Sequence, residues 1–449
     1  MKQHTPPLSH QKECVKQVHR FGGSALIADE QGLGKTYEAL LSVFLWERSP
    51  AIVVCPASLK WTWNREAWHH LRIRSLILNG RKPDKRTNLK GNKLVILNYQ
   101  ILEAWLPYLE KMEAGTLIVD ECQGIKNRTT KSYKNVRRLL QHVPHFLALS
   151  GTPLTNRPSE LWPVLNLLCP KEWPNFHPFA MEHCKPQRKP WGMTYNGAEK
   201  LPKLHRKMIR HCMIRRRKKE VLDLPEKIHS VVPLPLKNRK EYDKAETQFL
   251  RWLKETVGLS AAKKAQRAGK IVETGYHRRL AAKHKIPAVI DWIDDFLSNS
   301  DKKLVLMGCH QIAIQPLYKK YKNITVLVDG SVRGEKRQYA VDSFQNKKEK
   351  RLFIGNIQAA GVGLTLTAAS HLAFFELDWT PGNMMQASDR VHRIGQNETT
   401  NIYYLVAENT IEERIANIIQ SKASIVGSVL DGKNAETLDV HSLLLESLT

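Results

Sequence analysis

The sequence predicts an α/β protein made of two doubly wound parallel-sheet lobes in tandem, with helical protrusions between them. Short apolar runs alternate with helical patterns from residue 25 to residue 149 and again from residue 303 to residue 405. This alternation is typical of parallel strands that are covered by helices on both faces. Between Pro158 and Lys285 it stops, and polar or basic helical stretches take its place. A glycine-bearing loop of the kind that binds phosphate occurs in the first lobe and not in the second, so the two lobes are expected to differ in chemistry.

The first lobe is organised around residues 29–36, whose sequence is Asp-Glu-Gln-Gly-Leu-Gly-Lys-Thr. This stretch follows the apolar run 25–28 and precedes a helical pattern. It therefore predicts a strand, a turn and a helix start, where backbone N–H groups and the helix dipole face an anion. Lys35 can reach the β and γ phosphates of a nucleotide, and the Thr36 hydroxyl can bind Mg²⁺. Because the usual consensus has a further glycine at the position of Asp29, the loop alone could also be an ordinary one.

The strongly basic composition favours a polyanionic partner. The 449 residues include 70 Lys and Arg against 43 Asp and Glu, which gives a formal net charge of +27. Such a field most commonly attracts nucleic acid, although charge alone does not separate DNA from RNA or from an anionic membrane surface. The N-terminal residues lack the apolar core of a signal peptide, and no run approaches the ~20 apolar residues that span a bilayer. We therefore expect no membrane partner.

The seven cysteines are scattered along the chain with no C-x-x-C pair. An odd number of dispersed cysteines is typical of reduced thiols, so we expect an intracellular protein. The repeated pairs His183-Cys184 and His211-Cys212 leave a zinc site open as an alternative. Their surroundings lack the closely spaced ligand pairs of known zinc sites, which argues against it.

Four further strands are predicted in the first lobe, at residues 51–55, 94–99, 116–119 and 146–149. The strand 116–119 delivers Asp120 and Glu121 at its carboxyl end, where open α/β sheets place their chemistry. We predict that Asp120 binds Mg²⁺ and that Glu121 orients and deprotonates an attacking water. Acidic pairs at strand ends are also common helix caps, so this prediction depends on their position after Lys35 and Thr36.

Two other features of the first lobe are assigned to the nucleotide site. The turn after strand 146–149 contains Ser150, Gly151 and Thr152, which could sense the nucleotide and couple its state to the rest of the lobe. Gln11 has an amide that can donate to and accept from the adenine edge at once, although a lone glutamine is more often a surface residue. The candidate nucleotide-binding residues of the first lobe are Gln11, Asp29, Glu30, Gln31, Gly32, Leu33, Gly34, Lys35 and Thr36. Gly363, in a glycine-bearing loop of the second lobe, is a further candidate because its loop allows close approach to a nucleotide.

Two stretches of the first half are candidates for contact with a DNA backbone. The loop after strand 51–55 offers Ser58, Lys60 and Trp63, with the alternative that the tryptophan belongs to the core. Residues 215–219 form the basic run Arg-Arg-Arg-Lys-Lys. Such a run is usually a solvated face and can resemble a nuclear import signal. Its position between two folded lobes favours a DNA-facing protrusion at least as well.

Five strands are predicted in the second lobe, at residues 303–307, 324–328, 351–354, 371–375 and 401–405. Because this lobe has no phosphate loop, it is expected to supply positive charge instead. Gln386, Arg390 and Arg393 are four and three residues apart, which predicts one face of a single helix. That helix is expected to end by Gly395, and its arginines to point across a cleft at the γ phosphate. The alternative is an exposed helix in which Asp389 is an intrahelical partner.

Taken in order, these motifs resemble those of the Swi/Snf-family ATPase motors of helicase superfamily two. The matching segments are residues 29–36, 120–121 with 125–127, 150–156 with 160–162, 215–222, 329–331 and 386–396. The resemblance extends from about residue 8 to about residue 419. His310, the segment 329–331 and the segment 404–407 are most similar to the annealing-helicase branch, which rewinds DNA and remodels forks. The chain departs from the family pattern at Gln31 and at Cys122-Gln123, and the second departure leaves open how the acidic motif couples to the Ser150 turn.

The resemblance implies two RecA-like lobes with ATP and Mg²⁺ as cofactors, and an ATP-driven translocase acting on double-stranded or branched DNA. A monomer is expected, in a bacterial or viral-host cytoplasm or nucleoid rather than a nucleus, because no accessory domain accompanies the motor. Together with the basic run, the candidate DNA contacts are Ser58, Lys60, Trp63, Tyr99, Lys126, Asn127, Arg215, Arg216, Thr365 and Trp379. The alternatives are a strand-separating DNA or RNA helicase and a non-hydrolysing DNA-binding scaffold.

The predicted domains follow from the same motifs. They are an ATP-binding lobe at residues 1–165, a basic helical protrusion completing it at 166–235, a helical bridge at 236–285, a C-terminal lobe at 286–420 and a helical brace at 421–449.

Overall fold

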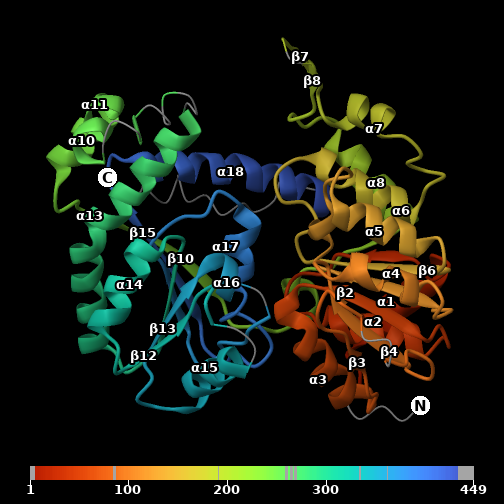
Figure 1. The fold of residues 1–449 in the computed structure, drawn as a ribbon. Helices are drawn as coiled ribbons and strands as arrows, with labels where there is room; N and C mark the ends of the chain where they lie inside the picture. The colour runs from red at the N-terminus through yellow and green to blue at the C-terminus, as the bar shows by residue number, and fades with distance from the viewer. Residues whose placement is uncertain are drawn as a thin grey trace. The chain divides into compact units, whose positions relative to one another are not determined.

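The computed structural model describes residues 6–83, 87–190, 192–257, 261–262, 266, 270–332, 335–361 and 363–432. Within these residues the chain divides into two compact units, the first up to residue 223 with residues 422–432 and the second at residues 224–421. Each unit contains a parallel sheet with helices on both faces, as Figure 1 shows. The predicted fold class is therefore confirmed.

The sheet of the first unit has its strands in the order β3-β4-β2-β5-β6-β1-β9, and every neighbouring pair is parallel. The strands are β1 (Ala25–Ile27), β2 (Ala51–Cys55), β3 (Leu76–Ile77), β4 (Leu94–Asn98), β5 (Thr116–Asp120), β6 (His145–Leu149) and β9 (Met213–Ile214). The central strands are almost wholly apolar because both of their faces are buried. All five predicted strands are present, whereas β3 and β9 are too short to give a sequence pattern.

Helices cover both faces of this sheet. One apolar cluster joins one face of the strands to helical residues between Leu102 and Met208, and it does not include the buried residues of the first three helices. The helices are α1 (Ser9–Arg20), α2 (Lys35–Phe44), α3 (Lys60–Leu71), α4 (Leu102–Leu109), α5 (Lys131–Leu140), α6 (Trp162–Leu168), α7 (Phe176–His183), α8 (Leu201–His211) and α9 (Lys218–Val221). Short 3-10 turns are η1 (Ala57–Leu59), η2 (Cys122–Ile125) and η3 (Pro158–Glu160), and a hairpin joins β7 (Gln187–Lys189) to β8 (Gly192–Thr194).

The strand order of the first unit determines which loops meet. Strands β5, β6 and β1 are neighbours, and they are parallel, so their carboxyl ends lie at one edge of the sheet. The loops that leave this edge are the phosphate loop after β1, the acidic pair at the end of β5 and the Ser150 turn after β6. Three motifs that are spread over residues 29–152 of the chain therefore lie side by side.

The sheet of the second unit has the order β10-β15-β14-β11-β13-β12, again with parallel neighbours throughout. The strands are β10 (Lys227–Leu234), β11 (Leu304–Gly308), β12 (Thr325–Val328), β13 (Leu352–Asn356), β14 (His371–Phe374) and β15 (Thr400–Ala407). The five predicted strands are present. The eight-residue β10 was not part of the predicted sheet, because its sequence lies in the basic region between the lobes.

Two separate apolar clusters cover the two faces of this second sheet. One face packs against α13 and α14, and the other against α15, α16, α17 and α18. The helices of the unit are α10 (Arg239–Thr247), α11 (Phe249–Thr256), α13 (Lys270–Asn299), α14 (Gln311–Lys320), α15 (Glu335–Asn346), α16 (Ile357–Ala360), α17 (Pro381–Ser388) and the first half of α18 (Ile411–Leu430), whose residues from Lys422 on belong to the first unit. No helix within the described ranges combines the length and apolarity of a membrane span.

Two boundaries differ from the predicted domains. The division between units falls after Asp223, and β10 belongs to the second sheet, although residues 166–235 were expected to complete the first lobe. The end of α18 packs in the core of the first unit through Val426, Val429 and Leu430. Of the expected brace at 421–449, residues 433–449 lie outside the described residues.

Candidate active site

The phosphate loop joins β1 to α2 in the predicted strand-turn-helix arrangement. Gly32 and Gly34 have φ angles of +92° and +89°, a region that side chains with a Cβ rarely adopt. Gly34 is also the N-cap of α2, and a Cβ there would overlap the amide of Gln11. The two glycines are thus required by the backbone of the loop, and the N–H groups at the start of α2 face the turn.

Lys35 lies inside this loop. Its Nζ donates to the backbone carbonyls of Asp29 at 2.7 Å and Glu30 at 3.1 Å, so the loop curls around the ammonium group. Burial lowers the pKa of Lys35, and the nearby carboxylates, led by Glu121, oppose that effect. An ammonium group held by two backbone carbonyl oxygens is suited to exchange them for an anion.

Asp29 occupies the position at which the consensus has glycine, and its side chain is fully buried. Arg216 neutralises it, with Nε and Nη2 at 3.2 and 2.5 Å from the two carboxylate oxygens. The same guanidinium contacts Glu38 at 3.2 Å and the backbone carbonyl of His10. The prediction that Arg216 faces DNA is therefore wrong for this structure, because the side chain supports the phosphate loop from inside the unit.

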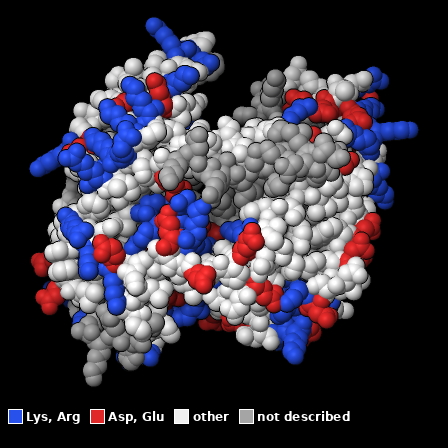
Figure 2. All heavy atoms as spheres, turned by 180° about the vertical axis from the view of Figure 1, so that it is seen from behind, with Lys and Arg blue, Asp and Glu red and all other residues white. Residues whose placement is uncertain are grey.

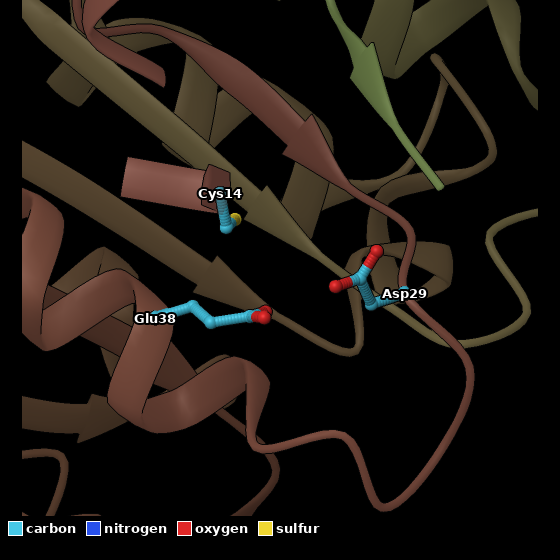
Figure 3. Close-up of side chains that lie close together, drawn as sticks. All are labelled: Cys14, Asp29 and Glu38. Carbon is cyan, nitrogen blue, oxygen red and sulfur yellow. The ribbon is translucent and has the colours of Figure 1, made fainter. Parts of the chain in front are cut away.

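Figure 3 shows Cys14, Asp29 and Glu38 gathered beneath the phosphate loop. Their ligand atoms lie within 4.8 Å of one another, and within the described ranges they are the one such group of potential metal ligands. The guanidinium of Arg216 already contacts both carboxyl groups, so the cluster is an ion-pair network rather than a metal site. Burial raises the pKa of both the Cys14 thiol and Glu38. The zinc alternative at His183-Cys184 and His211-Cys212 gains no support from the described residues.

Asp120 is held at the end of β5 by dedicated donors. Trp63 Nε1 donates to one carboxylate oxygen at 2.7 Å, and the Glu121 backbone N–H donates to the other at 2.9 Å. The Tyr99 hydroxyl donates to the carbonyl oxygens of both acidic residues, at 2.7 and 3.2 Å. Burial, followed by the charge of Glu121, raises the pKa of Asp120 to about 7, whereas the hydrogen bond from Trp63 opposes the shift. A cation beside Asp120 would favour its ionised form.

Trp63 and Tyr99, which were predicted DNA contacts, thus belong to the support of the acidic pair. Trp63 is 1% exposed, so the core alternative stated for it is correct. Burial also raises the pKa of Tyr99, which keeps its hydroxyl a donor. The sequence pattern did not indicate these roles because 57 and 21 residues separate the two aromatic residues from Asp120.

Gln123 joins the acidic pair to the Ser150 turn. Its Nε2 donates to Glu121 Oε2 at 2.7 Å, and its Oε1 accepts from Ser150 Oγ at 2.8 Å. Ser150 Oγ in turn accepts from the backbone N–H of Thr152 at 3.1 Å. The departure from the family pattern at this position therefore preserves a direct link, because an amide can donate and accept at once. We missed Gln123 as a site residue, although the two-sided chemistry of its amide could have indicated it.

Arg215 ties together the loops behind this site. It donates to the backbone carbonyls of Ala28 at 2.8 Å and Gly151 at 3.1 Å, and it pairs with Asp431 at 2.9 Å. Its side chain is 7% exposed. The prediction of a DNA contact for Arg215 is therefore also contradicted. Gly151 itself packs so closely on the Gln31 side chain that a Cβ would lie 2.7 Å from it.

Gln11 is placed beside the phosphate loop, as the prediction of a nucleotide contact requires. Its Nε2 donates to the Leu33 carbonyl at 3.1 Å, and its Oε1 accepts from the Leu8 N–H at 3.0 Å. The adjacent His10 ring contacts the same Leu33 carbonyl at 3.0 Å. Gln11 is 5% exposed, so both ends of the amide are engaged within the first unit.

The remaining candidate DNA contacts of the first unit divide by exposure. Ser58 and Asn127 are exposed, as a phosphate contact requires. Lys60 is 8% exposed and donates to the Leu78 carbonyl at 3.0 Å, so its charge is directed inward. Lys126 is partly exposed and donates to Thr155 Oγ1 at 2.8 Å.

In the second unit, helix α17 ends at Ser388, and the expected single helix to Gly395 is not formed. Arg390 and Arg393 therefore follow the helix in turns rather than sharing its face with Gln386. The capping N–H of Asp389 bonds to carbonyls of the last helical turn, and its carboxylate pairs with Lys227 at 3.2 Å. The alternative of an intrahelical partner for Asp389 is not supported.

The two arginines nevertheless come together. Arg390 Nη1 and Arg393 Nη1 donate to the same carbonyl, that of Leu364, at 3.3 and 3.2 Å. Arg390 also donates to the backbone carbonyl of Gln386, and Arg393 donates to Thr365 Oγ1 at 3.0 Å. Both arginines thus hold the loop that follows Gly363. These contacts bring the candidate residues Gly363 and Thr365 next to the two arginines.

The two remaining candidate DNA contacts lie in this second unit. Thr365 is half-buried and accepts from Arg393, as described above. Trp379 is half-buried, and the Arg278 guanidinium lies over its ring at 5.2 Å from the centroid. The DNA contacts predicted for these two residues stay predictions.

Two family models match the chain. The SNF2-related domain matches residues 10–284, and the helicase conserved C-terminal domain matches residues 288–395. The chain belongs to the SNF2-related family. The predicted resemblance to Swi/Snf motors is thereby confirmed. The first matched segment includes the whole first sheet, and the second includes β11, β12, β13 and β14 of the second sheet.

Similar proteins include eukaryotic family members. The mouse protein named DNA annealing helicase and endonuclease ZRANB3 is 32% identical, over 96% of this chain and 41% of its own length. A Xenopus laevis protein, SWI/SNF-related matrix-associated actin-dependent regulator of chromatin subfamily A-like protein 1, is 32% identical over 93% of this chain and 43% of its own length. The chain therefore spans about two fifths of the length of these curated relatives.

Among solved structures, the Sulfolobus solfataricus SWI2/SNF2 ATPase core in complex with dsDNA is similar to this chain. It aligns with 99% of this chain and 97% of that chain, at 22% sequence identity and a TM-score of 0.46. The fold stated above depends on the strands and helices of this chain and not on that alignment.

Proposed function

We propose that this chain is an ATP-hydrolysing motor that moves along double-stranded DNA. One observation carries the proposal, the meeting of the phosphate loop, the acidic pair and the Ser150 turn at the carboxyl ends of β1, β5 and β6. The Gln123 bridge connects two of these loops directly. A lysine, a hydroxyl and two carboxylates in this arrangement are the groups that phosphoryl transfer to water requires.

The donor set of the first unit fits ATP with Mg²⁺. The Thr36 hydroxyl and the Asp120 carboxylate are hard oxygen ligands, which Mg²⁺ prefers. Burial raises the pKa of Asp120, and a bound cation would lower that pKa again. When bound, Mg²⁺ would neutralise charge on the β and γ phosphates. Lys35 would exchange its two carbonyl partners for phosphate oxygens, and Glu121 would take the proton of the attacking water.

Arg390 and Arg393 are proposed to complete the catalytic set in the DNA-bound state. Their shared contact with the Leu364 carbonyl supports this role, because it keeps two guanidinium groups together at one loop of the second unit. If the two arginines reach the γ phosphate only when DNA is bound, ATP hydrolysis depends on the DNA.

Double-stranded or branched DNA is the proposed substrate. The net charge of +27 supports a polyanionic partner, and Figure 2 shows lysine and arginine side chains on the surfaces of both units. Contacts with phosphate carry no sequence information, so binding is expected to be sequence-independent and to weaken steeply with salt. The similarity to proteins named annealing helicases supports rewinding of branched DNA as the finer proposal.

The central test is ATP turnover with and without DNA. Duplex DNA should raise turnover well above the level without DNA, and more than single strands or RNA do. Lys35→Ala and Glu121→Gln should each lower turnover by about 10³-fold and leave DNA binding largely intact. Stronger stimulation by RNA or single strands would favour a strand-separating or RNA-acting helicase. No turnover with any polynucleotide would favour the scaffold.

A second assay separates translocation from rewinding. Displacement of a third strand from a triplex reports movement along duplex DNA, whereas fork regression and strand annealing report rewinding. A monomeric state and a cytoplasmic or nucleoid location remain proposals that rest on the dispersed cysteines and the single set of motor motifs.

A further inference from the structure

Helix α3 of the first unit carries an exposed stripe of aromatic and basic residues. Trp61 and Trp68 are seven residues apart, so they lie nearly in line on the helix, and their exposed fractions are 60% and 44%. Arg65 is exposed between them on the same face. Arg72 directly follows the helix, and its guanidinium lies 5.3 Å from the centroid of the Trp68 ring. We call these four residues the α3 stripe.

The stripe is not needed to hold the helix in place. The opposite face of α3 is buried through Trp63, Ala67 and Leu71, which pack in the first unit. Substitutions in the stripe are therefore expected to leave the fold unchanged. Two large indoles on one solvent-facing line, away from the packed face, are typical of a surface that contacts a partner.

The charge around the stripe is of one sign. The exposed basic residues between positions 57 and 82 are Arg65, His69, Arg72, Arg74, Arg81 and Lys82. No aspartate or glutamate in this stretch is exposed within the described residues, and the half-buried Glu66 bonds to His70 at 3.1 Å. The surface of α3 therefore favours an anionic partner.

The indoles specify what kind of anion fits. In duplex DNA the faces of the bases are stacked on one another, so exposed indoles cannot reach them. Unpaired bases present their faces, and stacking on aromatic side chains beside a basic groove is the usual way in which proteins bind single strands. We propose that the α3 stripe binds an unpaired DNA strand, with bases on Trp61 and Trp68 and phosphates at Arg65 and Arg72.

The spacing of the two indoles and the neighbouring turn η1 both fit an unpaired DNA strand. Seven helical residues separate the indoles by ~10 Å along the axis, which matches a strand of a few nucleotides. The turn η1 directly precedes α3 and exposes Ser58, a candidate phosphate contact, so a strand could continue from that turn onto the stripe. The proposal rests on the proposed DNA-binding function and extends it from duplex to branched DNA with an unpaired arm.

The test compares three DNA ligands on the full chain. The double variant Trp61→Ala with Trp68→Ala is titrated, without ATP, with a labelled single strand, a blunt duplex of the same sequence and that duplex carrying a single-stranded arm. We expect the affinity for the single strand to fall by ~25-fold or more, at ~5-fold or more for each of the two stacked bases. The arm should lose its contribution to affinity. Binding of the blunt duplex and duplex-stimulated ATP turnover should stay within about twofold, so failure here is distinguishable from failure of the motor proposal.

Two controls are available in the same unit. Trp46→Ala removes an indole that is 41% exposed, stacked on His19 and not part of α3, and it should change no affinity. Trp61→Phe with Trp68→Phe keeps an aromatic face and should retain most of the single-strand affinity. The proposal is overturned if the wild-type chain does not bind the single strand, or if the alanine variant binds it normally. Equal losses for single strand and blunt duplex, or an equal loss in Trp46→Ala, would overturn it as well.

Discussion

Both units have a parallel sheet, but the turn after one internal strand has different partners in the two units. After β1, the turn into α2 has Lys35 folded inside it, and the Lys35 ammonium group donates to the Asp29 carbonyl. After β11, the turn into α14 receives an anion from the chain itself. Glu376 accepts from the N–H groups of Cys309 and His310 at 2.8 and 2.9 Å, and its other oxygen contacts His310 Nδ1 at 2.5 Å.

The electrostatics of the two sites follow this difference. Burial acts to raise the pKa of Glu376, but the contacts from His310 and the two N–H groups outweigh it and the pKa is lowered. At Asp120 burial prevails, and the pKa is raised to about 7. The second unit therefore has a buried carboxylate whose ionised form is favoured by its donors, whereas the first has a buried carboxylate whose ionised form is disfavoured.

The largest effect is expected from breaking the proposed contribution of the second unit to catalysis. Arg393→Ala should lower DNA-stimulated ATP turnover by about 10³-fold, because it removes charge from the γ phosphate in the transition state. DNA binding should persist. Arg414→Ala is the matched control, since this arginine is 67% exposed and forms a surface pair with Glu246. Normal turnover in Arg393→Ala would show that the second unit supplies no catalytic charge through this residue.

The next effect tests the internal anion. Glu376→Gln should destabilise the second unit by about 2 kcal/mol, because hydrogen bonds to a buried charged group are stronger than those to a neutral one. Hydrogen exchange in β11 and the first turn of α14, with the denaturation midpoint, measures the change. Glu398→Gln serves as the control, since that carboxylate is 48% exposed and its pair with Lys302 should contribute little. Equal stability of Glu376→Gln and wild type would mean that the charge is not what holds this turn.

A smaller effect concerns the bridge between the loops of the first unit. Gln123→Ala should lower ATP turnover by about tenfold while ATP affinity changes little, because Glu121 loses a group that orients it. Gln123→His should restore part of the turnover, since an imidazole can also donate and accept. Gln187→Ala, in the exposed β7 strand, should have no effect. Full ATP turnover in Gln123→Ala would show that the Gln123 bridge is not needed for catalysis.

The smallest effect is a pH dependence at the edge of the second sheet. Burial, with help from Lys227 and His392, lowers the pKa of His229 on β10 to about 4. Its folded pKa is thus below its unfolded value of about 6.5, so the unfolded state binds more protons between these values and stability is lost as pH falls from about 6.5 to 4. Hydrogen exchange in β10 and β15 should increase over this window in the wild type and less so in His229→Gln. Identical pH profiles would show that another group is responsible.

Local patterns predicted the strands, the phosphate loop and the acidic pair, because each depends on residues close together in the sequence. The family and the fold class are confirmed by the matched domains and by the two parallel sheets. The catalytic roles of individual residues remain predictions. Their placement at one edge of the first sheet is consistent with them.

The errors come from partners that are distant in sequence. The basic run at 215–219 suggested a solvent-facing surface, but Arg216 is 187 residues away from Asp29, and only the pairing of β9 with β1 brings them together. The sequence showed that position 29 has aspartate where the consensus has glycine. It did not show that the Arg216 guanidinium neutralises this aspartate. The length of α17 was overestimated because a spacing of four and three residues is also compatible with turns.

The contact of Arg216 with Asp29 has a consequence for the order of synthesis. When a ribosome has completed residue 165, the nucleotide loop lacks its guanidinium, and the edge of β1 opposite β6 is still unpaired. About fifty more residues must emerge before β9 closes that edge and neutralises the buried carboxylate. A fragment cut at the end of the expected ATP-binding lobe would therefore be incomplete where the nucleotide binds, although it would contain every residue of the phosphate loop.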